Sequence, residues 1–200
     1  MNDKDIGLAP VTSGTQLCSD LTYNGAYFYS DGGYVKQAES FNVNREMTLS
    51  VEIRPRSLDG VIFSVHGKGD FVILQLVEGE LWFTADNGAG AFTAKYIPEM
   101  NNKLCDGGWH TVKAEKIKNV VILTVDNKDP ISESSAGTAT SADTNNPIYL
   151  GGKPDNITKG VRAKGEYKGC IRNLAINGER QYLIDGVAFG NASTESCPAN

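Results

Sequence analysis

Apolar and polar side chains alternate along this chain with a period of two, and this pattern restricts the possible folds more than any other feature of the sequence. Between residues 47 and 54, Met, Leu, Val and Ile alternate with Thr, Ser, Glu and Arg. Successive side chains of a strand point to opposite faces, so this segment is predicted to be a strand with one buried and one solvated face. No segment longer than two turns carries an apolar stripe with the helical period.

Several more segments have strand character, and turn residues separate them. Glu78-Gly79 and Lys118-Asn119 predict two hairpins. Many short strands at a spacing of about 8–12 residues are typical of an all-β sandwich or barrel. Because the chain has no internal repeat, a propeller or solenoid is disfavoured. Strands are predicted over residues 61–65, 71–77, 81–84, 109–115, 120–125, 147–150 and 167–176.

The two stretches without periodicity are predicted to lie outside the strands. Residues 1–20 are polar and rich in Gly, Ser and Thr, so they are interpreted as a linker or tail before a single domain over residues 21–200. Residues 132–146 are rich in Ser, Ala, Thr, Asp and Asn and are predicted to be a long loop. Long loops on β scaffolds tend to carry function.

Composition and charge exclude several classes of protein. Apolar residues make up 40% of the chain and charged residues 22%, which is a globular composition. With 19 Lys and Arg against 24 Asp and Glu, the net charge is -5, so nucleic acid is not an expected partner. No apolar run is long enough for insertion into a membrane. Residues 1–4 are not followed by the apolar region of a signal peptide, so a secreted protein would be represented here by a mature fragment or an excised module.

Cysteines and glycosylation sequons favour an extracellular protein. No Cys-x-x-Cys pair and no cysteine near a histidine at metal-ligand spacing is present, which argues against zinc. An even number of cysteines and two Asn-x-Ser/Thr sequons, at Asn156 and Asn191, are typical of secreted chains. The alternative is a cytosolic protein with four buried thiols. Three disulfide pairings are possible among Cys18, Cys105, Cys170 and Cys197.

The sequence offers little support for catalysis. It has no Gly-x-Ser-x-Gly elbow and no phosphate-binding glycine loop. His66 and His110 are interpreted as structural residues, and Glu78 and Glu80 as solvated ones rather than as the paired carboxylates of a glycosidase. The chain is therefore predicted not to be an enzyme.

Two features indicate binding instead. The loops 67–70 and 140–146 carry Asp70 and Asp143, and calcium prefers such carboxylate and carbonyl oxygens, although lone loop aspartates also act as turn caps. Residues 153–180 contain seven basic and three acidic side chains. This segment either binds anionic glycans or is a solvated edge protected by lysines.

Four motifs, in this order, resemble those of laminin G-like domains: residues 81–90 (LWFTADNGAG), 105–112 (CDGGWHTV), 138–152 (TATSADTNNPIYLGG) and 167–174 (YKGCIRNL). In detail the chain resembles the last globular domain of a laminin α chain more than neurexin or agrin, over residues 21–198. The resemblance implies a jelly-roll β-sandwich of about fourteen strands. It also implies the disulfides Cys18–Cys105 and Cys170–Cys197.

The resemblance further implies a calcium site at one rim of the sandwich. Its ligands would be the side chains of Asp70 and Asp143 and the backbone carbonyls of Asn87 and Ser141. An incompletely ligated site of this kind is expected to bind Ca²⁺ with a dissociation constant of about 10⁻⁴–10⁻³ M.

The function implied is that of a secreted, non-enzymatic adhesion module of the extracellular matrix and basement membrane. Its partners would be acidic glycans of the α-dystroglycan type, heparin, heparan sulfate or sulfatide, together with other laminin domains of the same chain. The alternative is a spacer domain with a weak or absent calcium site that binds heparin through a basic patch only. The candidate glycan-binding residues are Lys95, Lys113, Lys116, Lys118, Lys153, Arg162, Lys164 and Lys168.

Overall fold

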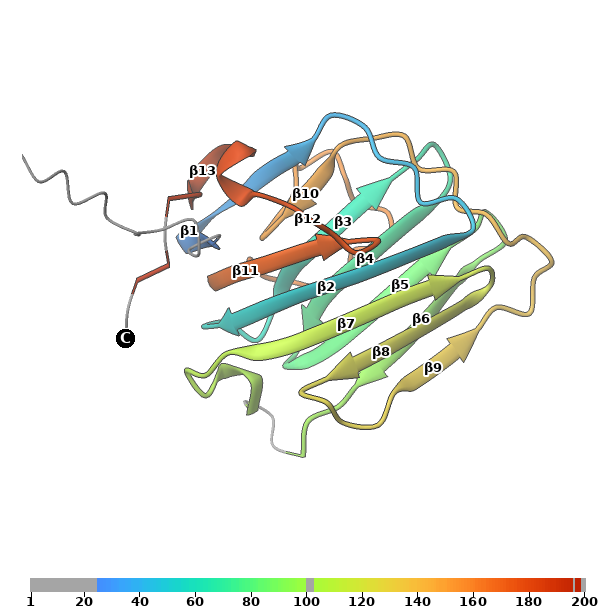
Figure 1. Cartoon of the computed structure of the whole chain (residues 1–200), viewed down its shortest axis with the longest axis horizontal. Helices are drawn as coiled ribbons and strands as arrows, with labels where there is room; N and C mark the ends of the chain where they lie inside the picture. Colours follow the sequence, from blue (N-terminus) through green and yellow to red (C-terminus); the bar gives the residue numbers. More distant parts are fainter. Residues whose placement is uncertain (1–24, 100–102, 196, 199–200) are drawn as a thin grey trace, which may run out of the picture.

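The computed structural model describes residues 25–99, 103–195 and 197–198, and within them the chain is almost entirely strand (Figure 1). The predicted linker, residues 1–20, lies outside this part. Two short 3₁₀ turns are present, η1 (Lys103–Cys105) and η2 (Leu183–Asp185). The strands are β1 (Gly25–Ala38), β2 (Glu46–Pro55), β3 (Gly60–His66), β4 (Phe71–Val77), β5 (Glu80–Asp86), β6 (Ala91–Tyr96), β7 (His110–Ile117), β8 (Val120–Val125), β9 (Ile131–Ser134), β10 (Ile148–Leu150), β11 (Gly169–Ile176), β12 (Glu179–Arg180) and β13 (Val187–Ser193).

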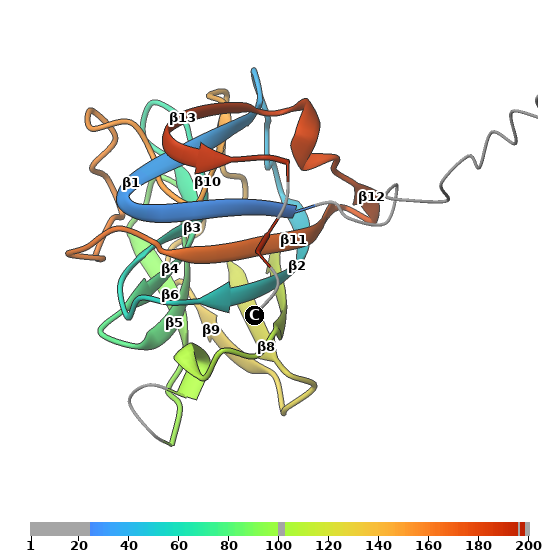
Figure 2. The same cartoon turned by 90° about the vertical axis from the view of Figure 1, so that its left-hand side faces the viewer.

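The strands form one antiparallel path that folds into two layers. Its order is β6-β5-β4-β3-β10-β1-β11-β2-β7-β8-β9, with β12 beside β11 and β13 beside β1. The two ends of the path meet, because β6 packs against β8 and β9. Figures 1 and 2 show the layer containing β11, β2 and β7 stacked against the layer containing β3, β4 and β5. The predicted all-β jelly-roll sandwich is therefore confirmed, with thirteen strands in the described residues.

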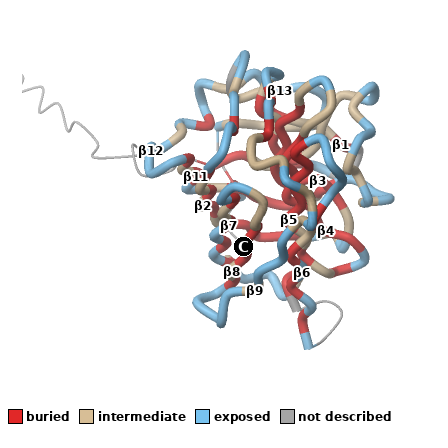
Figure 3. Tube along the Cα trace, turned by 90° about the vertical axis from the view of Figure 1, so that its right-hand side faces the viewer, coloured by how far each residue is buried: buried red, intermediate tan, exposed pale blue. Residues whose placement is uncertain are grey.

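The core lies between the layers, where the inward faces of the strands meet (Figure 3). In β2, Met47, Leu49, Val51 and Ile53 are buried and the residues between them are less so, as the alternation predicts. The hairpin turns are also confirmed. Glu78 and Gly79 have positive φ angles of 53° and 88°, which suits the two-residue turns that connect twisted strands.

The fold differs from the prediction in three respects. Strands β1, β6, β12 and β13 are not among the predicted segments. Strand β9 includes residues 132–134 of the predicted long loop and pairs with β8. Strands β3 and β4 are buried along their whole length, on both faces. Their outer face is covered by the segment 153–168. The side chain of Gln75 binds it, because its Nε2 donates to the Gly160 carbonyl (2.9 Å) and its Oε1 accepts from the Arg162 amide (2.8 Å).

One of the two implied disulfides is present. Cys170 of β11 is bonded to Cys197, which confirms that pair. Cys105 is half-buried, its Sγ donates to the Ser57 carbonyl (3.0 Å), and burial raises the pKa of its thiol. Cys18 lies outside the described residues, so the pair Cys18–Cys105 stays a prediction.

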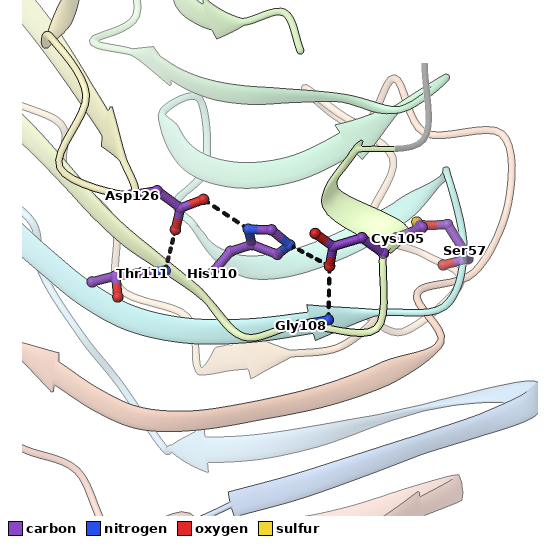
Figure 4. Close-up of polar contacts among 7 residues, drawn as sticks. Ser57, Cys105, Gly108, His110, Thr111 and Asp126 are labelled. Atoms are coloured by element: carbon purple, nitrogen blue, oxygen red, sulfur yellow. Dashed lines mark hydrogen bonds and ion pairs between the residues drawn. The ribbon is translucent and has the colours of Figure 1, made fainter. Parts of the chain in front are cut away.

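His110 has a structural role at the start of β7 (Figure 4). Its buried ring lies between two carboxylates, with Nδ1 2.8 Å from Asp126 Oδ2 and Nε2 3.2 Å from Asp106 Oδ1. Asp126 Oδ1 also accepts from the Thr111 amide (2.9 Å). The network ties the η1–β7 turn to the end of β8.

Neither 3₁₀ turn in the described part of the chain has the length and apolarity of a membrane span.

Candidate calcium-binding rim and basic groove

Three loops, 67–70, 87–90 and 140–146, meet at one rim of the sandwich and bring the predicted calcium ligands together. The backbone N–H of Asp143 donates to Asp70 Oδ2 (2.8 Å), and Ser141 Oγ donates to Asp143 Oδ1 (3.1 Å). Asp70 also borders the β5–β6 turn, because an ideal Cβ built on Gly88 would stand 3.1 Å from Asp70 Oδ1. We call this cluster of Asp70, Asn87, Ser141 and Asp143 the rim site.

The β5–β6 turn presents its backbone, and not its side chains, to the rim. Asp86 is 7% exposed, and its Oδ1 accepts from the amides of Gly88 (2.8 Å) and Gly90 (3.2 Å). Asn87 is equally buried, and its Nδ2 donates to the carbonyls of Lys118 (3.1 Å) and Ala139 (2.9 Å). Because the Asn87 side chain is turned inward, its backbone carbonyl is the atom left for a ligand role.

The oxygen donors of the rim site suit calcium. Asp143 is exposed and Asp70 and Ser141 are half-buried, so solvent and a ligand have access. Ca²⁺ takes carboxylate and carbonyl oxygens in irregular numbers and tolerates water in the remaining positions. No three His, Cys, Asp or Glu side chains converge on a metal site among the residues that the structure describes. An ion at the rim would thus need the backbone carbonyls as well as the two carboxylates.

Close backbone contact at Gly67 holds the 140–146 loop beside the end of β3. Gly67 and Thr144 form an isolated β-bridge, and the Asn146 amide donates to the His66 carbonyl (3.0 Å). An ideal Cβ on Gly67 would stand 1.9 Å from the Asp143 carbonyl oxygen. Only glycine allows this approach.

The substitution Gly67→Ala is therefore expected to displace the Asp143 segment. We expect a loss of roughly 1–3 kcal/mol in the free energy of unfolding, the usual range for overpacking, and a weakening of calcium binding. Gly69→Ala in the same loop is the matched control, because no atom lies within 4 Å of its added Cβ. Denaturant unfolding and calcium calorimetry of both variants measure the effects, and equal behaviour of the two variants would contradict this prediction.

A basic groove lies next to the rim site, on the outer face of β4, β5 and β6. Its volume is about 360 Å³. Lys159 links the groove to the rim, because its Nζ donates to the Gly69 carbonyl and lies 3.8 Å from Asp86 Oδ2. Lys95 Nζ lies 3.8 Å from the centre of the Trp82 ring, in a cation–π contact. The cations that line the basic groove are Lys95, Lys159 and Arg162.

Comparison with known proteins identifies the family. The model of the laminin G domain family matches residues 53–179. The chain belongs to the laminin G domain family. Over 177 residues, 88% of this chain, it is 36% identical to laminin subunit alpha-1 of Mus musculus, and it is 32% identical over 202 residues, 98% of this chain, to the laminin subunit alpha of Drosophila melanogaster. It spans only 6% and 5% of the lengths of these relatives.

A solved structure supports the same assignment. The mouse laminin alpha1 chain, domains LG4-5, superposes with a TM-score of 0.79 at 34% sequence identity. The superposition covers 88% of this chain and 47% of that one.

The cations predicted for glycan binding are dispersed over this laminin G domain. Lys95 and Arg162 line the basic groove. Lys153 and Lys164 border a different pocket, and Lys164 pairs with Glu78 (2.5 Å). Lys113 pairs with Glu115 (3.0 Å) on β7. Lys118 lies in the β7–β8 turn and Lys168 is half-buried before β11. The eight residues thus do not make one patch.

The prediction that Lys116 contacts a glycan is wrong, because its side chain is fully buried. Lys159, by contrast, was not among the predicted candidates. It belongs to the basic segment 153–180, but charge alone gave no reason to prefer it over its neighbours. Its place in the groove follows from the covering of β4 by this segment.

Both sequons of the domain are accessible. Asn156 is exposed and lines a small pocket that also includes Lys159, so a glycan there would stand beside the basic groove. Asn191 is exposed on β13. Glycosylation of either residue stays a prediction.

Proposed function

We propose that this laminin G domain is a secreted adhesion module of the extracellular matrix and basement membrane that binds acidic glycans with the help of calcium. The rim site and the basic groove adjoin each other, and this is the observation that carries the proposal. The family membership and the Cys170–Cys197 disulfide favour an extracellular location.

The rim site and the groove cations contact different parts of the ligand. Asp70 and Asp143 contribute carboxylates to a calcium ion, and Asn87 and Ser141 contribute backbone carbonyls. Bound calcium supplies a positive centre with open coordination positions for the carboxylate of an acidic sugar. The groove cations attract sulfate or carboxylate groups on neighbouring sugars.

Lys159 defines the direction in which such a ligand runs. It contacts the carbonyl of Gly69, the residue before Asp70, and also lines the basic groove. An anionic chain anchored at the rim therefore crosses Lys159 and continues over β4 to β6. Heparin, heparan sulfate, sulfatide and α-dystroglycan-type glycans have this acidic chemistry. The other laminin domains of the same chain are the expected structural neighbours of this domain.

Substitutions in the basic groove test the glycan part of this proposal. The triple variant with Lys95, Lys159 and Arg162 changed to Gln is expected to elute from heparin at distinctly lower salt, because each cation lost removes about one released counterion. The control triple variant changes Lys113, Lys153 and Lys164 to Gln, which removes the same charge from outside the groove. Equal retention of the two variants would contradict the assignment of the groove.

The alternative function is a spacer domain that binds heparin through basic residues alone. Heparin retention measured with calcium and with a chelator separates the two. Retention that is stronger in calcium supports the proposed joint site, whereas retention that is identical in both buffers favours the alternative.

A further inference from the structure

Lys116 is the one fully buried lysine of the described residues, and its Nζ contacts the loop that carries Ser141 and Asp143. Along β7 the buried residues are His110, Val112, Ala114 and Lys116, so the side chain extends from the inward face of the strand. Its Nζ donates to the carbonyls of Asn44 (2.8 Å), Thr140 (3.0 Å) and Arg45 (3.3 Å). All three donor positions of the ammonium group therefore have partners.

These carbonyls belong to two loops that are far apart in the sequence. Asn44 and Arg45 precede β2, and Thr140 belongs to the loop that carries Ser141 and Asp143. Asn44 and Ala142 also exchange both backbone hydrogen bonds, at 3.0 and 2.8 Å. The β1–β2 loop is thus bonded to the 140–146 loop at Ala142, and Lys116 Nζ joins Asn44 to Thr140.

These hydrogen bonds determine the direction of the backbone groups on either side of Ala142. In a trans peptide unit, the C=O and the following N–H point in opposite directions. Because the N–H and the C=O of Ala142 both face Asn44, the carbonyl of Ser141 and the N–H of Asp143 face the other way. The backbone N–H of Asp143 accordingly reaches Asp70 Oδ2.

A buried ammonium group at this position is not expected to increase the overall stability of the domain. Burial lowers the pKa of Lys116 to about 8, although the carboxylates of Asp70 and Asp143 act in the opposite direction. A buried charge carries a desolvation cost that an apolar side chain of similar volume avoids. A local role at the rim accounts better for the residue.

We propose that Lys116 is a positioning residue that takes over, in the metal-free protein, the ordering of the rim loop that calcium would otherwise supply. Its positive charge faces the same pair of carboxylates from the interior side, and its three hydrogen bonds fix the backbone beside Ser141. The consequence for calcium rests on the proposed function, whereas the ordering of residues 139–146 does not.

Amide hydrogen exchange in a chelating buffer tests the proposal. We expect Lys116→Met and Lys116→Gln to speed exchange of the Asn44 and Ala142 amides by about tenfold or more, because the loops lose their common anchor. The β4–β5 hairpin amides should be unaffected, and Lys116→Arg should retain wild-type protection. The matched control is Lys113→Met, on the exposed face of the same strand. A folded Lys116→Met or Lys116→Gln protein with wild-type exchange at these amides overturns the proposal.

Addition of calcium distinguishes this inference from the proposed function. If the rim site binds the ion, millimolar calcium restores protection of residues 139–146 in Lys116→Met. If calcium changes exchange in neither the wild type nor the variant, the calcium site is refuted. The role of Lys116 is then still decided by the metal-free comparison.

Discussion

Calcium binding is expected to disappear when either rim carboxylate loses its charge, in Asp70→Asn or in Asp143→Asn. With two carboxylates and two carbonyls as protein ligands, each charge is a large part of the attraction for the ion. A loss of about a hundredfold from a starting dissociation constant of about 10⁻⁴–10⁻³ M removes binding from the measurable range. Calorimetry with up to several millimolar calcium measures it.

Asparagine is preferred to alanine at position 70 because it keeps a local contact. Asp70 Oδ2 accepts the Asp143 amide, and the asparagine side-chain oxygen still accepts that bond while the charge is gone. Asp129→Ala is the control. This exposed aspartate follows the last residue of β8, whereas the Lys118 turn precedes the first residue of that strand. Wild-type affinity in both asparagine variants would refute the rim site, and a parent protein that binds no calcium would leave the spacer function.

Most of the strands were predictable because their signal is local. Alternation in residues 47–53 states which side of β2 is buried without reference to any other segment. The almost continuous apolar run Phe71–Val77 is a local sign that β4 is buried on both faces. The segment that covers it was not predictable, since it lies about 85 residues further along the chain, as the Gln75–Gly160 contact shows.

The candidate site was predictable to a smaller degree. Two loop aspartates suggested a shared calcium site, but selecting the four oxygens needed the resemblance to a family. The alternation of His110, Val112, Ala114 and Lys116 already indicated that Lys116 points inward. Its basic character outweighed that pattern and wrongly suggested a surface role. The basic groove was not predictable from the sequence, because Lys95 lies on β6 and Lys159 in the segment that covers β4, and only the fold brings the two together.

Removal of the Cys170–Cys197 disulfide is expected to lower the free energy of unfolding by about 3–4 kcal/mol. The bond closes a loop with a sequence separation of 27 residues, and cross-links of that span restrict the unfolded chain by about this amount. The double variant Cys170→Ala/Cys197→Ala is suitable because both residues are buried and alanine adds no polar group. Urea unfolding of the double variant and of the wild type measures the change, and Cys105 is left in place in both because its predicted pair with Cys18 would contribute as well. A change below about 1 kcal/mol would contradict the prediction.

The same variant should leave the rim site intact as long as the domain is folded. Cys170 pairs with Arg54 near one end of β2, whereas Glu46 at the other end pairs with Ile117, the residue after Lys116. The disulfide and the rim site therefore lie at opposite ends of β2. Sites so far apart, without a shared partner, affect stability independently. Unchanged calcium affinity together with reduced stability is the expected result, and a parallel loss of both would show that the whole sandwich, and not the rim loops alone, maintains the ligand geometry.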